Sequence, residues 1–184
     1  YDRKEFTVVA AVDRHLEVGL NWQVRTVVTR LSSPGKPASF RIPLLPGEKV
    51  LTSRAIVEDG VIEVRLGAGV STFAWESTLP TGVDVPLVAP ETDRWVERWH
   101  LVTSPVWNAA LSGLAPVFEP QEENLVPVWH PWPGETVTLS FSKPEAVAGA
   151  TGLGQSSISR TDARLRPACP RAPGLLGSHV ISWA

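Results

Sequence analysis

The segment Leu16-Glu17-Val18-Gly19-Leu20-Asn21-Trp22-Gln23-Val24 decides the fold class, because apolar and polar residues alternate through all nine positions. A period of two places the apolar residues on one face of an extended strand. We therefore predict a half-buried β-strand over these residues. A hairpin turn at 13–15 would join it to an earlier strand over 6–12, where β-branched and apolar residues predominate.

Similar patterns recur along the next 120 or so residues and indicate an all-β protein. Asp59-Gly60 lies between two β-branched runs, and this dipeptide tolerates the positive φ angles of a type I′ hairpin turn. Alternation predicts strands over 95–103 and 136–142, and further strands are expected over 39–44, 49–56 and 70–79, with a turn at 46–48. The fold class is an antiparallel β-sandwich or open barrel with proline-rich connections.

Prolines restrict two parts of this fold. Residues 80–90 contain three prolines and one glycine, which favours a connection or an edge strand and makes 80–92 a possible sub-division of the domain. Prolines recur six times over 105–133, so that long helices are excluded there. Trp107 and Leu111 are spaced for a single helical turn, which Ser112-Gly113 would end.

The chain changes character after residue 149. We expect one β-sandwich domain over 1–149 and a poorly structured tail over 150–184, which is rich in Gly, Ser, Arg and Pro and shows little alternation. Such a segment cannot offset its ordering entropy by burial. It is either a flexible native tail or non-native sequence, and its lone Cys169 and unusual ending slightly favour the second interpretation.

Composition excludes several classes of function. Basic and acidic residues number 17 and 19, which leaves no electrostatic footprint for nucleic acid. A single cysteine excludes an intrachain disulfide and a multi-cysteine metal site. The chain shows no membrane-spanning apolar run, signal peptide or lipidation motif, and lacks methionine even at position 1. We therefore expect a processed chain or a piece of a longer protein, with any membrane anchor outside this sequence.

Eight tryptophans are the most unusual feature of the composition. A row of exposed indoles on a β-sandwich can stack against sugar rings, although tryptophan more often fills a core. The candidates for a stacking platform are Trp95, Trp99, Trp129 and Trp132. Of these, we predict that Trp99, Trp129 and Trp132 stack against a ligand. Trp129 and Trp132 stand among prolines in an expected loop, whereas the alternation assigns Trp22 and Trp75 to the core.

Metal binding has one weak candidate arrangement. His100 and His130, with Asp93 or Glu97, would form a metal site only if the fold brought them together. Neither His-x-His nor His-Glu-x-x-His spacing occurs, and zinc needs three or four convergent ligands. We predict no metal site and no cofactor.

Catalysis has equally weak candidates. Glu91 with Asp93, or Glu122 with Glu123, would suit a glycosidase, which uses two carboxyl groups, but adjacent acids in proline-rich loops are usually solvated. No Gly-x-Ser-x-Gly elbow is present, and the glycine-rich stretches do not fit a phosphate-binding loop. We predict no catalytic residue and expect that the protein is not an enzyme.

Several motifs resemble a group of bacterial proteins. The strongest is Trp129-His130-Pro131-Trp132-Pro133-Gly134-Glu135, and the others lie at 42–48, 104–108, 112–114 and 143–147. Over about residues 40–150 the chain resembles the extracytoplasmic β-rich portion of large, poorly characterised bacterial membrane-anchored proteins. This resemblance implies a location on the periplasmic or cell-surface side of a bacterial membrane, and it carries over no functional residue.

These observations lead to a ranked expectation of function. The first is a non-catalytic structural or protein-interaction module that offers sheet edges and aromatic loops to another protein or to another domain of the same chain. The alternative is a carbohydrate-binding module, with the exposed tryptophans as its platform. The third is a glycoside hydrolase with a site in 91–135. We expect no nucleic-acid partner, and contact with a membrane only through a segment outside this sequence.

Overall fold

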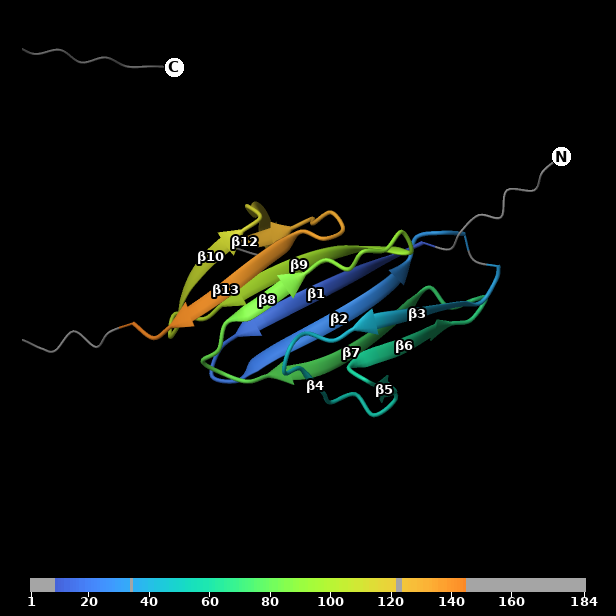
Figure 1. Cartoon of the computed structure of the whole chain (residues 1–184), viewed down its shortest axis with the longest axis horizontal. Coiled ribbons are helices and arrows are strands. Elements are labelled where there is room, and N and C mark those ends of the chain that lie inside the picture. The colour runs from blue at the N-terminus through green and yellow to red at the C-terminus, as the bar shows by residue number, and fades with distance from the viewer. Residues whose placement is uncertain (1–8, 34, 122–123, 145–184) are drawn as a thin grey trace, which may run out of the picture. The chain divides into compact units, whose positions relative to one another are not determined.

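The computed structural model describes residues 9–33, 35–121 and 124–144, which form an all-β fold (Figure 1). This part of the chain contains thirteen strands and no helix. The chain divides into two units, Tyr1–Ala146 and Val147–Ala184. The predicted tail over 150–184 and the start of the strand predicted over 6–12 lie outside the described residues.

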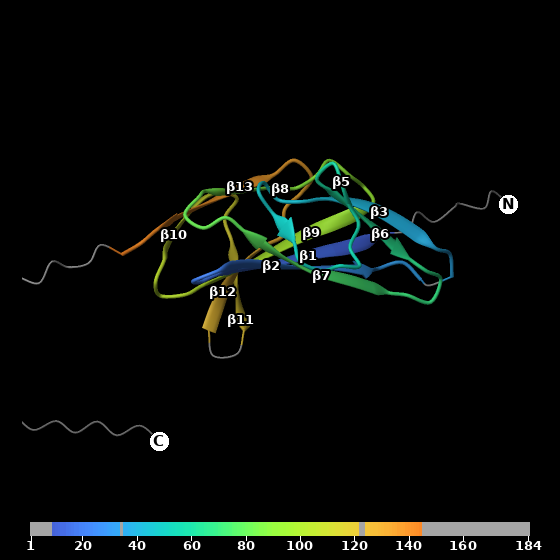
Figure 2. The same ribbon diagram turned by 90° about the horizontal axis from the view of Figure 1, so that it is seen from below.

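Seven strands form the large sheet of the fold. Its order is β11 (Val117–Gln121), β12 (Asn124–Trp129), β9 (Trp95–Thr103), β1 (Ala10–Val18), β2 (Trp22–Arg30), β7 (Thr72–Leu79) and β4 (Lys49–Val50). The pair β1 and β9 is parallel, whereas the other neighbours in this sheet are antiparallel. The β11–β12 hairpin projects away from one face of this sheet (Figure 2).

Two smaller sheets cover the other face of the large sheet, side by side (Figures 1 and 2). One has the order β10 (Asn108–Gly113), β13 (Thr136–Ser142) and β8 (Val85–Val88). The second has the order β3 (Ala38–Pro43), β6 (Val61–Leu66) and β5 (Val57–Glu58). The described fold is therefore a sandwich whose second layer is split in two.

The first hairpin corrects the prediction for 6–24. Its turn is at 19–21, not at 13–15, so that residues 13–15 lie inside β1 and Leu16–Val24 spans two strands. Val18 lies directly opposite Trp22 in the antiparallel register, and opposed residues share a face of the sheet. The alternation therefore continues through the reversal, while Leu20 at the turn is 87% exposed.

Of the other predicted turns and strands, some are present in the structure and others differ from the prediction. The Asp59-Gly60 turn is confirmed, with φ angles of 51° and 72°, and so is the edge strand in 80–90, which is β8. The helical turn over Trp107 to Leu111 is wrong, because 108–113 pairs with β13 as strand β10. Of 49–56, only Lys49–Val50 is a strand.

The interior contains two separate apolar cores. One lies between the large sheet and the β10–β13–β8 sheet, and includes Leu16, Trp22, Leu87, Trp99, Trp129 and Leu139. The other lies between the large sheet and the β3–β6–β5 sheet, and includes Val12, Phe40, Ile42, Ile62, Val64 and Trp75. Each small sheet thus buries its own half of the inner face.

Candidate functional site

The three predicted stacking tryptophans do not form a platform. Trp99 and Trp129 are each 1% exposed and lie opposite one another on β9 and β12, within the first core. Their indole N–H groups donate inside the protein, to Glu97 Oε2 at 3.1 Å and to the Leu114 carbonyl at 2.9 Å respectively. Neither ring offers a face to a sugar, so the prediction for Trp99 and Trp129 is wrong.

Trp132 is the one member of the predicted platform that is exposed, at 77%. Its loop is braced, because the Trp132 N–H donates to Glu135 Oε2 at 2.8 Å and the Glu135 N–H donates back to the Trp132 carbonyl at 3.0 Å. Pro131 and Pro133 restrict the backbone on both sides. The loop therefore presents a single indole from a constrained turn.

The candidate metal and hydrolase residues are dispersed. Glu97 faces the interior, whereas His100 lies on the opposite face of β9 and His130 Nε2 lies 3.1 Å from Glu119 Oε1. In the described ranges no group of three or more His, Cys, Asp and Glu residues is arranged to hold a metal. Glu91 and Asp93 are exposed, and Glu122 with Glu123 lies outside the described residues.

A buried ionic cluster occupies the boundary between the two cores. Arg14 on β1 donates from Nε to Glu97 Oε2 at 3.0 Å and from Nη2 to the Pro43 carbonyl at 2.8 Å. Arg14 Nη1 lies 3.9 Å from Oε2 of a second carboxylate, Glu48. All three charged side chains are at most 3% exposed, so the cluster combines one positive and two negative groups without solvent.

Neutral hydrogen-bond donors stabilise the two buried carboxylates of this cluster. Glu97 accepts from the indole N–H groups of Trp95 and Trp99, at 3.0 and 3.1 Å. Glu48 accepts from the Ser77 hydroxyl at 2.5 Å and from the Leu45 backbone N–H at 2.7 Å. Buried charges are tolerated where hydrogen bonds compensate for lost hydration, and each carboxylate of this cluster accepts from neutral donors, so the cluster is a structural element of the core.

The outer face of the large sheet carries a second group of polar side chains. His15 and His100 lie opposite one another on the parallel strands β1 and β9, with ring centroids 4.3 Å apart and planes inclined by 15°. Burial and the charge of nearby Arg98 lower the pKa of both imidazoles, and the pKa of His100 falls to about 4. The lowered pKa values favour the neutral form of both rings at pH 7.

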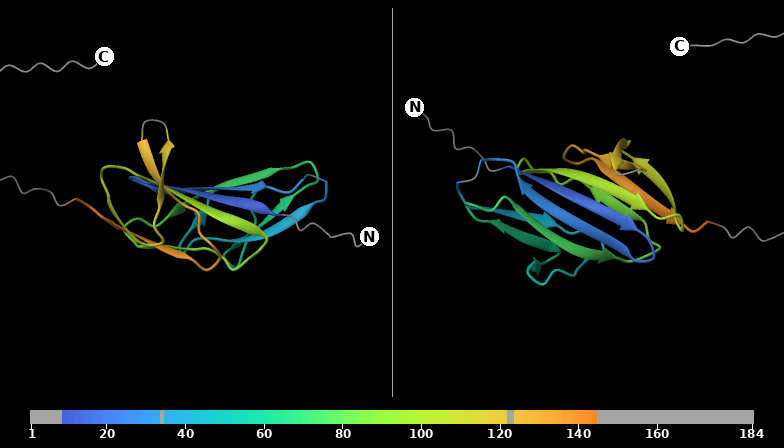
Figure 3. Two further views of the ribbon diagram at one scale, coloured as in Figure 1. Left: turned by 90° about the horizontal axis from the view of Figure 1, so that it is seen from above. Right: turned by 180° about the vertical axis from the view of Figure 1, so that it is seen from behind.

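A groove of about 590 Å³ lies beside this histidine pair. Outward-facing residues of β1, β2, β7 and β9 form its floor, and Gln121 contributes from β11. Figure 3 shows how the β11–β12 hairpin projects from the large sheet. The charged residues of the floor include Arg25 and Glu76, which lie directly opposite one another on β2 and β7. The alternation in 95–103 separates His100 from Glu97 and Trp99 without showing which face is outer, and the pairing of β1 with β9 has no local sequence signal.

Strand β10 forms an exposed sheet edge. It pairs with β13 on one side, and no described strand pairs with its other side. Leu114, just beyond β10, donates to the Thr136 carbonyl, which fixes 112, 110 and 108 as the residues bonded to β13 in this register. Ala109, Leu111 and Gly113 therefore direct their backbone N–H and C=O groups outward, to the free edge.

Comparisons with known proteins provide no family for this chain. No protein-family model matches it, and no curated protein matches it significantly. Among the described residues, no helix has the length and apolar character required to cross a membrane.

Proposed function

We propose that this chain is a non-catalytic, extracytoplasmic interaction module that binds an extended segment of another protein, or of another domain of its own chain, along β10. The observation that carries this proposal is the free edge of Asn108-Ala109-Ala110-Leu111-Ser112-Gly113, which contains neither a charge nor a proline. All six residues are exposed. Extended peptides commonly bind by adding a strand to such an edge.

The other sheet edges of the described fold are blunted, as expected where strand addition must be avoided. Pro86 lies in β8 on the side away from β13, where it removes a free backbone donor, and Pro120 lies in the edge strand β11. Edge strand β3 carries Arg41, while β4 and β5 are two residues long. The contrast with β10 supports a specific role for that edge.

The geometry of β10 suits a main-chain interaction. An antiparallel strand added over this length would form about six backbone hydrogen bonds, each contributing roughly 0.5–1.5 kcal/mol net. Small side chains at Ala109, Ala110 and Ser112 leave the approach open. The extracytoplasmic location rests on the resemblance over residues 40–150.

The test places a photo-crosslinking amino acid at Ser112 of the chain in its native context, with a second at exposed Thr81 as the control position. We expect a discrete crosslinked segment from position 112 only, and increased hydrogen-exchange protection of the β10 amides in the complex. Ala109→Pro removes an outward donor and should abolish the crosslink, whereas Ala109→Ser retains the donor and should preserve it.

Stability measurements separate edge blocking from misfolding. Ala110→Pro removes a donor to β13 and should lower the free energy of unfolding, whereas Ala109→Pro should leave it nearly unchanged. Persistence of the crosslink in folded Ala109→Pro, or equal crosslinking from position 81, would refute the proposal.

A further inference from the structure

The groove on the outer face of the large sheet combines adequate size with unused hydrogen-bonding groups. Its volume of about 590 Å³ lies within the range of roughly 300–1,000 Å³ typical of small-molecule sites. The projecting β11–β12 hairpin stands on this same side of the sheet (Figures 2 and 3). Four packed strands thus hold the floor in a fixed arrangement, on the face that neither small sheet covers.

Several polar side chains that line this groove form no hydrogen bonds or ion pairs with one another. Arg25 lies between His15 and Glu76 in the register of β1, β2 and β7, yet its guanidinium forms no hydrogen bond or ion pair within the described chain. The side chains of Glu76, Gln23 and Gln121 likewise form no hydrogen bond or ion pair with other described residues. By contrast, Arg98 on the same face pairs with Asp13 at 2.7 Å. The groove therefore presents donors and acceptors that remain available to a ligand.

The balance of these groups defines the chemistry of the ligand. Arg25 and the two glutamine amides supply donors, while the carboxylates of Glu17 and Glu76 supply acceptors. A neutral imidazole supplies one of each. The carboxylates disfavour a polyanion, and the many polar groups disfavour an apolar segment, which would leave them desolvated. Hydroxyl groups, which both donate and accept, match this mixture.

Apolar surface in the groove completes the match. The stacked pair of His15 and His100 and the side chains of Leu51 and Val102 line the groove, where their ring carbons and methyl groups can contact the C–H groups of a ring that also carries hydroxyls. We propose that this groove binds a neutral oligosaccharide, with Arg25 and Glu76 as its principal hydrogen-bonding contacts. This site is distinct from the tryptophan platform expected from the sequence and from the β10 edge.

The experiment begins with a glycan array of plant, bacterial and animal oligosaccharides, probed with the whole chain. The strongest neutral glycan is then titrated by calorimetry and by heteronuclear NMR. We expect chemical-shift changes concentrated on β1, β2, β7 and β9, including the imidazole signals of His15 and His100. Arg25→Gln and Glu76→Gln should each weaken binding about tenfold to a hundredfold, the usual effect of losing a charge-assisted hydrogen bond.

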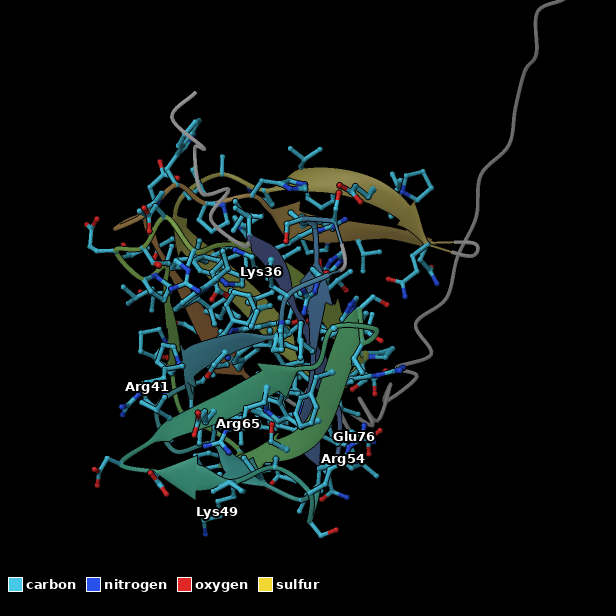
Figure 4. The ribbon with its side chains drawn as sticks, turned by 90° about the vertical axis from the view of Figure 1, so that its right-hand side faces the viewer. Lys36, Arg41, Lys49, Arg54, Arg65 and Glu76 are labelled. Carbon is cyan, nitrogen blue, oxygen red and sulfur yellow. The ribbon has the colours of Figure 1, made fainter. Side chains whose placement is uncertain are left out.

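Two control variants keep the result specific. Arg41→Gln changes another exposed arginine, on β3 of a small sheet, and should leave the affinity unchanged; in Figure 4 Arg41 and Glu76 lie on opposite sides of the view. Trp132→Ala should also retain binding. The inference is overturned if no neutral glycan binds, if inorganic phosphate competes for the groove, or if Trp132→Ala abolishes binding while folded Arg25→Gln does not.

Discussion

Replacing Arg14 by methionine tests whether the ionic cluster between the two cores stabilises the fold. Methionine retains the length and apolar character of the arginine stem and removes the charge. The change leaves the carboxylate of Glu97 without the donor at 3.0 Å and the carbonyl of Pro43 without its donor at 2.8 Å. It also removes the positive charge near Glu48, whose Oε2 lies 3.9 Å from Arg14 Nη1.

The expected loss for Arg14→Met is about 3–5 kcal/mol, the usual consequence of removing one partner from a buried ion pair. A domain with a total stability of roughly 5–15 kcal/mol would lose much of it. The assay is equilibrium urea unfolding followed by tryptophan fluorescence, because Trp99 adjoins Glu97 and reports on the cluster directly.

A double-mutant cycle makes the test specific to the charge. Glu97→Gln removes a negative charge and retains an oxygen that can accept from an indole N–H. We expect the double variant Arg14→Met/Glu97→Gln to be more stable than Arg14→Met alone, because one uncompensated charge has been removed. A loss below about 1 kcal/mol for Arg14→Met, or strict additivity in the cycle, would refute the assigned role.

His100, Gly113 and Trp132 each allow a separate test of the structure. Burial holds the pKa of His100 at about 4, below the ordinary 6.5, so the unfolded chain binds a proton more readily than the folded chain. The free energy of unfolding should therefore be highest above pH 6.5 and decrease by roughly 1–2 kcal/mol as the pH falls towards 4. His100→Asn should flatten this dependence, as measured by urea unfolding at several pH values. Gly113 has a φ of 97°, and an added Cβ would lie 2.3 Å from the Thr136 carbonyl oxygen, so Gly113→Ala should lower the melting temperature in calorimetry by several degrees, corresponding to about 1–3 kcal/mol. Trp132→Ala should change the free energy of unfolding by less than about 0.5 kcal/mol, since the ring packs on no core, and a larger loss would contradict its exposure of 77%.

The sequence predicted the strands well wherever side-chain alternation is local. In the strand predicted over 136–142, the alternating residues Val137, Leu139 and Phe141 face inward, and Asp59-Gly60 forms the turn that its backbone preferences favour. The turn at 13–15 was wrong because three consecutive polar residues normally indicate a loop, whereas here Arg14 is buried by partners more than 25 residues away. Local pattern does not encode those partners.

The candidate sites were less predictable because they depend on pairing between distant segments. The alternation in 95–103 places Glu97 between Trp95 and Trp99 on one face, which is a usable signal that a carboxylate lies inside. Stacking of His15 on His100, by contrast, requires β1 and β9 to be parallel and in register, and nothing within either segment specifies this. The open edge of β10 likewise appears only when its neighbours are known.

The ionic cluster and the outer groove share strands, which links internal stability to ligand binding. Arg14 and Ser77 face inward immediately beside His15 and Glu76, which face the groove on the same strands. Adjacent strand residues have fixed opposite orientations, so a shift of β1 or β7 that relaxes the cluster also moves the groove side chains. A glycan that binds only the aligned floor should therefore raise the melting temperature of the native chain. It should bind Arg14→Met more weakly even where that variant remains folded, although Arg14 touches no part of the groove.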